Sequence, residues 1–314
     1  MIATLFSRAW IWAFVAAGIT FAFTAAIGQT AGGTGLLIAA LTFSAFSVIV
    51  GLGQMFVITL GPGNVDLSIP ATMTLAGTVS LKYMGGAAGA DIALVGLLVA
   101  LGIGLGAGIA NFALIKLLRI PPIIATLASS FVYLSLAIWS NRGIRIKPPE
   151  ALSDFAIGRS LGVPNVAWLA LLIAVIAWVA LNRAAYGRNL SATGQNPRAA
   201  RLAGVPVDAV GAITYVLCAG LAGLTGFLLS CFSGGAALNM GTEYLLTSIA
   251  VVVIGGSSIG GGRSNVPGIW AGALFLFLIV SMLNSYGLGA GVRLLMTGLI
   301  IIAIVAAGSR PVRG

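Results

Sequence analysis

The stretch LLIAALTFSAFSVIVGLGQMFVITL, residues 36–60, contains no charged side chain and is long enough to cross a membrane as one helix. A transmembrane helix needs about 20 consecutive apolar residues. Comparable stretches recur along the chain and predict ten helices. Their ranges are 10–27, 36–60, 67–84, 91–117, 122–141, 165–182, 208–232, 243–257, 266–286 and 290–308. We expect the third, fifth and eighth to be short or interrupted half-helices, because Gly, Pro or polar residues break their apolar character.

The overall composition agrees with this interpretation. Of the 314 residues, 59% are hydrophobic and 7% are charged, whereas about a quarter of the residues of a soluble domain are charged. The apolar run after Arg8 could be taken for a signal peptide, but it is longer than a signal h-region, so we expect a first transmembrane helix. No linker divides the chain. The sequence therefore predicts an all-α integral membrane protein, with residues 1–314 forming a single transmembrane domain.

The scarcity of reactive side chains argues against a membrane enzyme. The chain has no histidine and six carboxylates, which leaves little material for acid–base catalysis, nucleophilic catalysis or a metal site. Cys218 and Cys231 lie in or beside one apolar segment and are expected to be buried thiols. The net charge of +10 comes from residues scattered in loops, without a basic run or a basic aromatic surface, so we expect no nucleic-acid partner.

The distribution of basic residues predicts the orientation in the membrane. With the N-terminus in the cytoplasm, the inner side holds more basic residues than the outer side. The inner set is Arg8, Lys116, Arg119, Arg183, Arg188, Arg198, Arg201, Arg263, Arg310 and Arg313, and the outer set is Lys82, Arg142, Arg145, Lys147, Arg159 and Arg293. The longest outer loop, residues 142–164, is a candidate surface for an extracytoplasmic partner.

The stretch GRNLSATGQNPRAARLAG, residues 187–204, predicts a short basic helix in the cytoplasmic loop 184–207. Asn196 can serve as N-cap, Pro197 suits the first helical position, and Gly204 supplies a left-handed exit. Arg198 and Arg201 share one face, while the small or apolar residues Ala199, Ala200, Leu202 and Ala203 form the remainder. We expect this helix to dock into a groove of a partner. The residues assigned to the docking are Gly187, Arg188, Gly194, Asn196, Pro197, Arg198, Ala199, Ala200, Arg201 and Gly204.

Residues 61–68, GPGNVDLS, separate two apolar runs, and a carboxylate near membrane depth is expensive unless it has a role. Asp66 could cap a half-helix beside a hydrophilic path, or it could be an ordinary N-cap in a surface loop. Glu243 opens another short apolar run in the same way. The two acidic residues fit an inverted repeat of the second to fifth and seventh to tenth helices. The candidate residues of a translocation path are Gly63, Asn64, Asp66, Ser68, Asn239 and Glu243.

Two glycine-rich stretches superficially resemble nucleotide-binding motifs. Residues 255–263, GGSSIGGGR, lack the Gly-Lys-Ser/Thr ending of a phosphate loop and follow a membrane helix, so we expect a tight cytoplasmic connection beside the docking helix. Gly102, Gly104, Gly106 and Gly108 lie within an apolar run, and their spacing favours small-residue faces for close helix packing.

Three motifs in fixed order resemble those of the permease subunit of ribose-type ABC importers. They are PGNVDLS at 62–68, the whole of 187–204, and IAVVVIGGSSIGGG at 249–262. The resemblance covers nearly the whole chain. Pro62 and Asn64 depart from the more usual Gly-Gly-Ile, and Pro70 stands where the family tends to have Gly.

The resemblance implies a ten-helix permease, similar in fold to the vitamin B12-type importers, that works with a second copy or a homologue in the cytoplasmic (inner) membrane of a bacterium. Cytoplasmic ABC ATPase subunits would bind ATP and Mg, so no cofactor is expected in this chain, and an extracytoplasmic binding protein would deliver a monosaccharide. The helix at 196–204 would be the coupling helix that the ATPases move.

Other cargoes and another class of transporter remain open. A nucleoside, a furanose signal molecule or a branched-chain amino acid would fit the same machine. A secondary transporter driven by ions usually has ionisable residues in the middle of its helices. Here Asp66, Asp91, Asp208 and Glu243 all fall at predicted helix ends, which argues against ion coupling.

Overall fold

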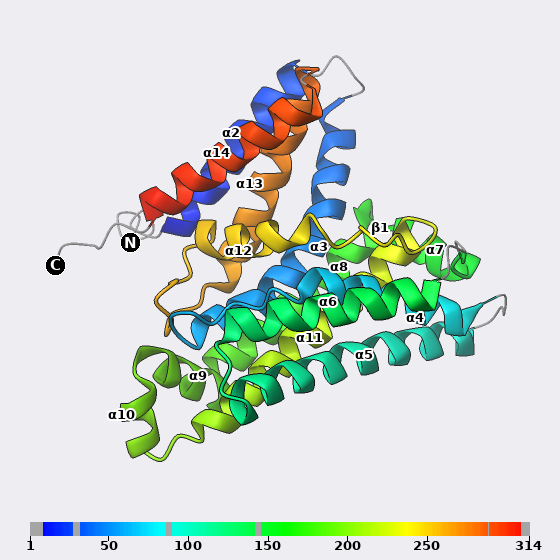
Figure 1. Cartoon of the computed structure of the whole chain (residues 1–314). Helices are drawn as coiled ribbons and strands as arrows, with labels where there is room; N and C mark the ends of the chain where they lie inside the picture. The colour runs from blue at the N-terminus through cyan, green and yellow to red at the C-terminus, as the bar shows by residue number, and fades with distance from the viewer. Residues whose placement is uncertain (1–8, 28–31, 86–89, 142–145, 288, 309–314) are drawn as a thin grey trace.

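The computed structural model describes residues 9–27, 32–85, 90–141, 146–287 and 289–308, and these residues are almost entirely helical (Figure 1). The long or apolar helices are α2 (Ala9–Ile27), α3 (Gly32–Thr59), α4 (Ile69–Met84), α5 (Ala90–Leu117), α6 (Pro122–Asn141), α8 (Asn165–Asn182), α11 (Val207–Phe232), α12 (Tyr244–Ile254), α13 (Val266–Ser285) and α14 (Ala290–Gly308). The short elements are α7 (Glu150–Ile157), β1 (Arg159–Ser160), β2 (Val163–Pro164), α9 (Ala185–Gln195) and α10 (Pro197–Leu202). The prediction of an all-helical protein is confirmed.

Each predicted apolar segment coincides with one helix, and the largest differences are at the start of α3 and at the end of α12. Among the described residues, α3, α5, α6, α8, α11 and α13 are long and apolar enough to cross a membrane. The chain is therefore a multi-pass membrane protein. Helix α12 has 11 residues, or about 16 Å of helix axis. Since a bilayer core is about 30 Å thick, α12 is too short to cross it.

The expectation that residues 122–141 form a short or interrupted segment was wrong. They form the continuous 20-residue helix α6. Pro122 occupies its first position, where the missing N–H costs nothing. The hydroxyl of Thr126 bonds back to the carbonyl of Pro122 at 2.9 Å, and that of Ser130 to the carbonyl of Leu127 at 2.6 Å. These hydroxyls are thus bonded to carbonyls of the same helix, and that of Thr126 bonds to a neighbouring segment as well.

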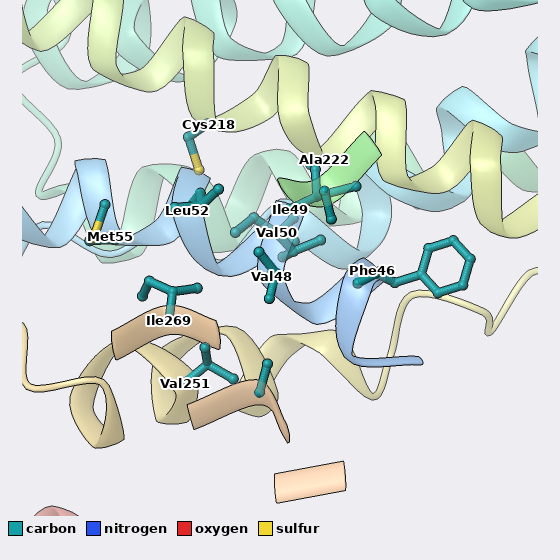
Figure 2. Packing of buried hydrophobic residues seen from close by; sticks show 14 of the residues in the cluster. Phe46, Val48, Ile49, Val50, Leu52, Met55, Cys218, Ala222, Val251 and Ile269 are labelled. Atoms are coloured by element: carbon teal, nitrogen blue, oxygen red, sulfur yellow. The ribbon is translucent and has the colours of Figure 1, made fainter. Parts of the chain in front are cut away.

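The hydrophobic core is built around α3, whose second half is buried on every side. Figure 2 shows Leu52 and Val48 of this helix between Cys218 of α11 on one side and Val251 and Ile269, of α12 and α13, on the other. Both cysteines are free and buried, as predicted. Helix α3 therefore ties the helices of the first half of the chain to those of the second half.

Small residues allow α5 and α11 to approach closely. A Cβ atom built on Gly104 would lie 2.9 Å from the Cα of Gly220, and one built on Gly108 would lie 2.6 Å from the carbonyl oxygen of Tyr215. Gly102 and Gly106 face open space instead. Only one of the two predicted glycine faces is used, because 3.6-residue periodicity places the other on the opposite side of α5.

The short elements lie at opposite ends of the molecule. Figure 1 shows α9 and α10 at one end, and α7 with the β1–β2 hairpin at the other, near the end of α4. Lys116, Arg201 and Arg263 all lie at the α9–α10 end, as the predicted inner set requires. The remaining residues used for the orientation include Arg8, Arg142, Arg145, Arg310 and Arg313, which lie outside the described residues, as does the side chain of Arg293.

Candidate functional site

The tip of the loop between α8 and α11 folds as the sequence predicts, whereas the helix α9 that precedes it was not predicted. The side-chain oxygen of Asn196 accepts hydrogen bonds from the backbone N–H groups of Arg198 and Ala199, each at 3.0 Å. Pro197 occupies the first position of α10, and Gly204 has φ = +83°, which a residue with a side chain rarely adopts. The result is a rigid one-and-a-half-turn helix, α10, at the tip of the loop. We call α9 and α10 together, residues 185–202, the coupling segment, after the role that the resemblance implies for it.

The end of α10 presents an exposed apolar side chain. Leu202, which the helical spacing grouped with packing residues, is 91% exposed. Ala200 is the residue of α10 that faces the protein, at 4% exposure. Arg198 is exposed as well. An isolated leucine beside a cation, on a helix that projects from the molecule, is a suitable anchor for a partner's groove.

Arg201 is exposed, as Arg198 is, but it is held in an ion pair that the sequence analysis did not predict. Its Nη2 atom lies 3.3 Å from Oδ1 of Asp208, and Nζ of Lys116 lies 2.6 Å from the other carboxylate oxygen. Asp208 therefore joins α5, α10 and α11. These charges are about half exposed, so each pair contributes about 0–1 kcal/mol. The sequence analysis did not predict this ion pair, because Arg201 and Asp208 belong to different helices and meet only through the turn at Gly204.

Four glycines join the coupling segment to the rest of the protein through direct backbone contact. A Cβ atom on Gly194 would overlap the carbonyl oxygen of Thr59 and the backbone nitrogen of Gly262. One on Gly261 would overlap the Cα of Gly61. The N–H of Gly262 donates to the carbonyl of Thr59 at 2.9 Å. We call Gly61, Gly194, Gly261 and Gly262 the glycine junction.

The glycine junction brings three parts of the chain to one point. These are the end of α3, the end of α9 and the connection between α12 and α13. The connection thus lies beside the predicted docking helix, as expected. A Cβ atom on Gly187 would likewise overlap the backbone of Leu181, whereas Arg188 is exposed.

A half-buried tyrosine fixes the start of α9. The hydroxyl of Tyr186 and that of Thr214 on α11 are 3.0 Å apart, and the ring of Tyr186 meets Phe56 of α3 edge to face, with centroids 6.2 Å apart. Burial raises the pKa of Tyr186 to about 12, so its hydroxyl stays protonated at physiological pH. Both ends of α9 are therefore attached to α3, and a displacement of α10 has a direct route into the helical core.

Asp66 lies in a buried polar network and not on an open path. Asp66 is 1% exposed. Its Oδ1 atom accepts hydrogen bonds from the backbone N–H of Ser68 at 2.8 Å and from the Ser68 hydroxyl at 2.6 Å. The backbone N–H of Asp66 donates to Oε1 of Gln54 at 3.3 Å. Asp66 thus shapes the turn before α4 and does not cap the helix itself, since it lies three residues before the first helical position.

The network continues into α5 and α6. Nδ2 of Asn111 donates to the hydroxyl of Ser68 at 2.8 Å, and Oδ1 of Asn111 accepts from Ser129 at 2.6 Å and from Tyr133 at 2.9 Å. The N–H of Leu67 donates to the Thr126 hydroxyl at 3.0 Å. At membrane depth each of these polar groups would be unsatisfied without its partner in the network. The network therefore fixes where α4 begins.

The other candidate path residues are distributed over two environments. Asn64 is half-buried and accepts a hydrogen bond from the hydroxyl of Tyr215 at 3.2 Å. Gly63, Asn239 and Glu243 are exposed. The exposed set and the buried pair Asp66 and Ser68 therefore do not form one continuous surface. The sequence analysis grouped Asp66 and Glu243 because each precedes a short apolar helix. They differ in burial because α5 and α6 cover the start of α4 and not the start of α12.

The segment that precedes α12 lies against α4. A Cβ atom on Gly241 would overlap the backbone of Pro70, and one on Gly77 would lie 2.5 Å from the terminal methyl group of Met240. The two short helices therefore start next to each other, although 175 residues separate their first positions. Discontinuous helices whose starts meet in this way are typical of transporters built from inverted repeats.

We predict that Asp66→Ala destabilises the protein by about 1–3 kcal/mol, because the buried N–H of Ser68 loses its acceptor. Asp66→Asn retains an acceptor oxygen of the same shape and should keep most of the stability. Thermal unfolding of the purified variants in detergent measures the difference. Equal losses in the two variants would contradict the assignment, since they would mean that the negative charge matters and the acceptor does not.

Comparison with known proteins gives one consistent result. The family described as branched-chain amino acid transport system / permease component matches residues 1–305. The ribose import permease protein of Escherichia coli (strain K12) is 30% identical over 264 residues, which cover 82% of this chain and 81% of the relative. The fructose import permease protein of Rhizobium meliloti is 32% identical over 302 residues, covering 87% and 80%. The galactofuranose transporter permease protein of Escherichia coli (strain K12) is 33% identical over 242 residues, covering 76% and 67%.

Proposed function

Since the chain belongs to the family of permease components that matches residues 1–305, we propose that it is the transmembrane subunit of an ATP-binding-cassette importer for a monosaccharide. The proposed class of cargo rests on the names of the relatives, which refer to ribose, fructose and galactofuranose. The three sequence motifs point to the same class. A branched-chain amino acid, named in the family description, is the second candidate.

The proposed architecture is a ten-helix permease with inverted repeats, similar to the vitamin B12-type importers. The contact between the starts of α4 and α12 supports this proposal, because these helices are the third and eighth apolar segments and hold equivalent places in the two repeats. The permease would work with a second copy or a homologue in the cytoplasmic membrane of a bacterium, and an extracytoplasmic binding protein would deliver the sugar.

The energy source in this proposal is a pair of cytoplasmic ATPase subunits, which bind ATP and Mg outside this chain. Their movement on ATP binding would displace the coupling segment, with Leu202 and Arg198 in contact with the ATPase. The glycine junction would carry that displacement to the end of α3 and to the connection between α12 and α13. Both repeats would then shift together around the starts of α4 and α12, which is the movement that alternating access requires.

The decisive experiment is to express the tagged chain with the genes beside its own and to purify it in detergent. We expect an ATPase to co-purify and its activity to rise when a binding protein and one particular monosaccharide are added. Stimulation by a branched-chain amino acid alone would select the second candidate. A chain that purifies alone and moves solute into liposomes under an ion gradient would overturn the proposal in favour of a secondary transporter.

A further inference from the structure

A cleft of about 510 Å³ lies between α4, α5 and α6, away from the coupling segment and the polar network around Asp66. Its lining has two parts. The apolar part comes from all three helices and consists of Leu75, Val79, Ile103 and Leu136. The polar and aromatic part comes from the last turns of α4 and α6 and consists of Lys82, Tyr83, Trp139 and Ser140.

The two parts are arranged along the helix axes. On α4 the lining extends from Leu75 to Lys82, about 10 Å at 1.5 Å per residue, and it changes from apolar to basic toward the end of the helix. On α6 it changes in the same direction, from Leu136 to Ser140. Both helix ends lie opposite the coupling segment (Figure 1). The cleft therefore has a polar mouth near one membrane surface and an apolar floor at greater depth.

Lys82 has no acidic partner at this mouth. Its Nζ atom lies over the ring of Trp139, 5.9 Å from the centroid, and the ion pairs found among the described residues do not include it. Trp139 and Tyr83 are 67% and 68% exposed. Tryptophan, tyrosine and lysine together are the residues that anchor a protein at the level of lipid headgroups. An ammonium group held above an aromatic ring is also available to an anionic ligand.

We propose that this cleft binds one anionic phospholipid, with its phosphate against Lys82 and one acyl chain on the floor formed by Leu75, Val79, Ile103 and Leu136. Charge complementarity selects a headgroup of net negative charge, because the choline cation of a zwitterionic lipid would repel Lys82, and the depth of the apolar floor selects the chain. A free sugar fits less well, because its hydroxyl groups would face aliphatic side chains and lose their hydrogen bonds. The lipid would link α4, the helix that starts at the polar network, to α5 and α6.

The test is a lipid titration of the purified, delipidated full-length protein, followed by native mass spectrometry. Phosphatidylglycerol and phosphatidylcholine with identical acyl chains are the two probes. We expect phosphatidylglycerol to bind more tightly, and Lys82→Gln to weaken its binding about five-fold, which is the contribution of one lysine near a membrane surface. Lys82→Arg keeps the charge and should keep the affinity. Lys147→Gln, which removes another exposed outer lysine that does not line the cleft, is the matched control.

Two further arms separate the headgroup from the chain. Val79→Phe narrows the floor and should weaken both lipids, whereas glycerol phosphate, which has the headgroup charge but no chain, should not displace phosphatidylglycerol at equal concentration. Equal affinity for the two lipids, or no effect of Lys82→Gln, would overturn the site. Displacement by glycerol phosphate would show that the phosphate alone is recognised and would overturn the role of the floor.

Discussion

Gly194→Ala is expected to abolish transport, because the glycine junction leaves no space for a methyl group. The added Cβ would overlap the carbonyl oxygen of Thr59 and the nitrogen of Gly262, and both are backbone atoms that cannot rotate away. Overpacking in a close-packed interior costs about 1–3 kcal/mol when side chains can adjust, and we expect more here. The end of α9 would have to move, and α10 would move with it. Uptake of radiolabelled sugar by cells and thermal unfolding of the purified variant measure the two consequences.

Gly260→Ala is the matched control for this change. Gly260 lies in the same glycine run, but a Cβ atom there would lie 3.5 Å from the nearest atom, the hydroxyl oxygen of Ser258, which is an ordinary contact. We expect normal uptake and an unchanged melting temperature for this variant. Normal uptake by Gly194→Ala at wild-type expression would show that the junction tolerates movement and would remove it from the coupling route.

The helices could be predicted closely because membrane insertion depends on local composition. Twenty apolar residues in sequence form a helix in a bilayer whatever surrounds them, since the backbone has no other way to satisfy its polar groups. The prediction ran furthest beyond a helix at α12, where it continued to Ser257 and the helix ends at Ile254. The glycines at 255 and 256 end it, and Gly256 has φ = +78°.

Helix α10, but not α9, could be predicted for the same local reason. Asn196, Pro197 and Gly204 specify the limits of α10 through bonds and dihedral angles within a few residues. The exposure of Leu202 could not be predicted in this way, because a short helix with one apolar residue at its end gives no periodicity to read. Its position two residues before the exit glycine is the only local signal.

The contacts of the site between residues far apart in the chain could not be predicted from the sequence. Thr59 and Gly194 are in contact although 135 residues separate them, and no pattern in either stretch indicates that contact. Asp66 was assigned to a path or a cap on the strength of its charge alone. Its burial depends on Asn111 of α5, whose amide reaches Ser68 from the opposite side. A single sequence shows that a polar residue needs a partner but not which helix supplies it.

Leu202→Asp is expected to separate the permease from its ATPase with little effect on folding. The side chain is 91% exposed, so its replacement removes no internal contact. Burying a leucine side chain in a partner's groove contributes about 2 kcal/mol, which corresponds to roughly 30-fold in affinity. A buried aspartate in that groove adds the penalty of an unpaired charge. Co-purification of the ATPase, its stimulation by binding protein and sugar, and uptake by cells should all fall, while the melting temperature stays within a degree or two.

Leu161→Asp supplies a control of the same chemistry at the other end of the molecule. Leu161 lies at the tip of the β1–β2 hairpin, is 94% exposed and has φ = +55°, a conformation that aspartate adopts more readily than leucine. This variant should retain the ATPase in full, because the hairpin and the coupling segment lie at opposite ends (Figure 1). If the Leu202→Asp variant also retains the ATPase, then the ATPase does not bind the end of α10. Arg198, the remaining free cation of that helix, would then be the next residue to replace, with Glu as the substitution that reverses its charge.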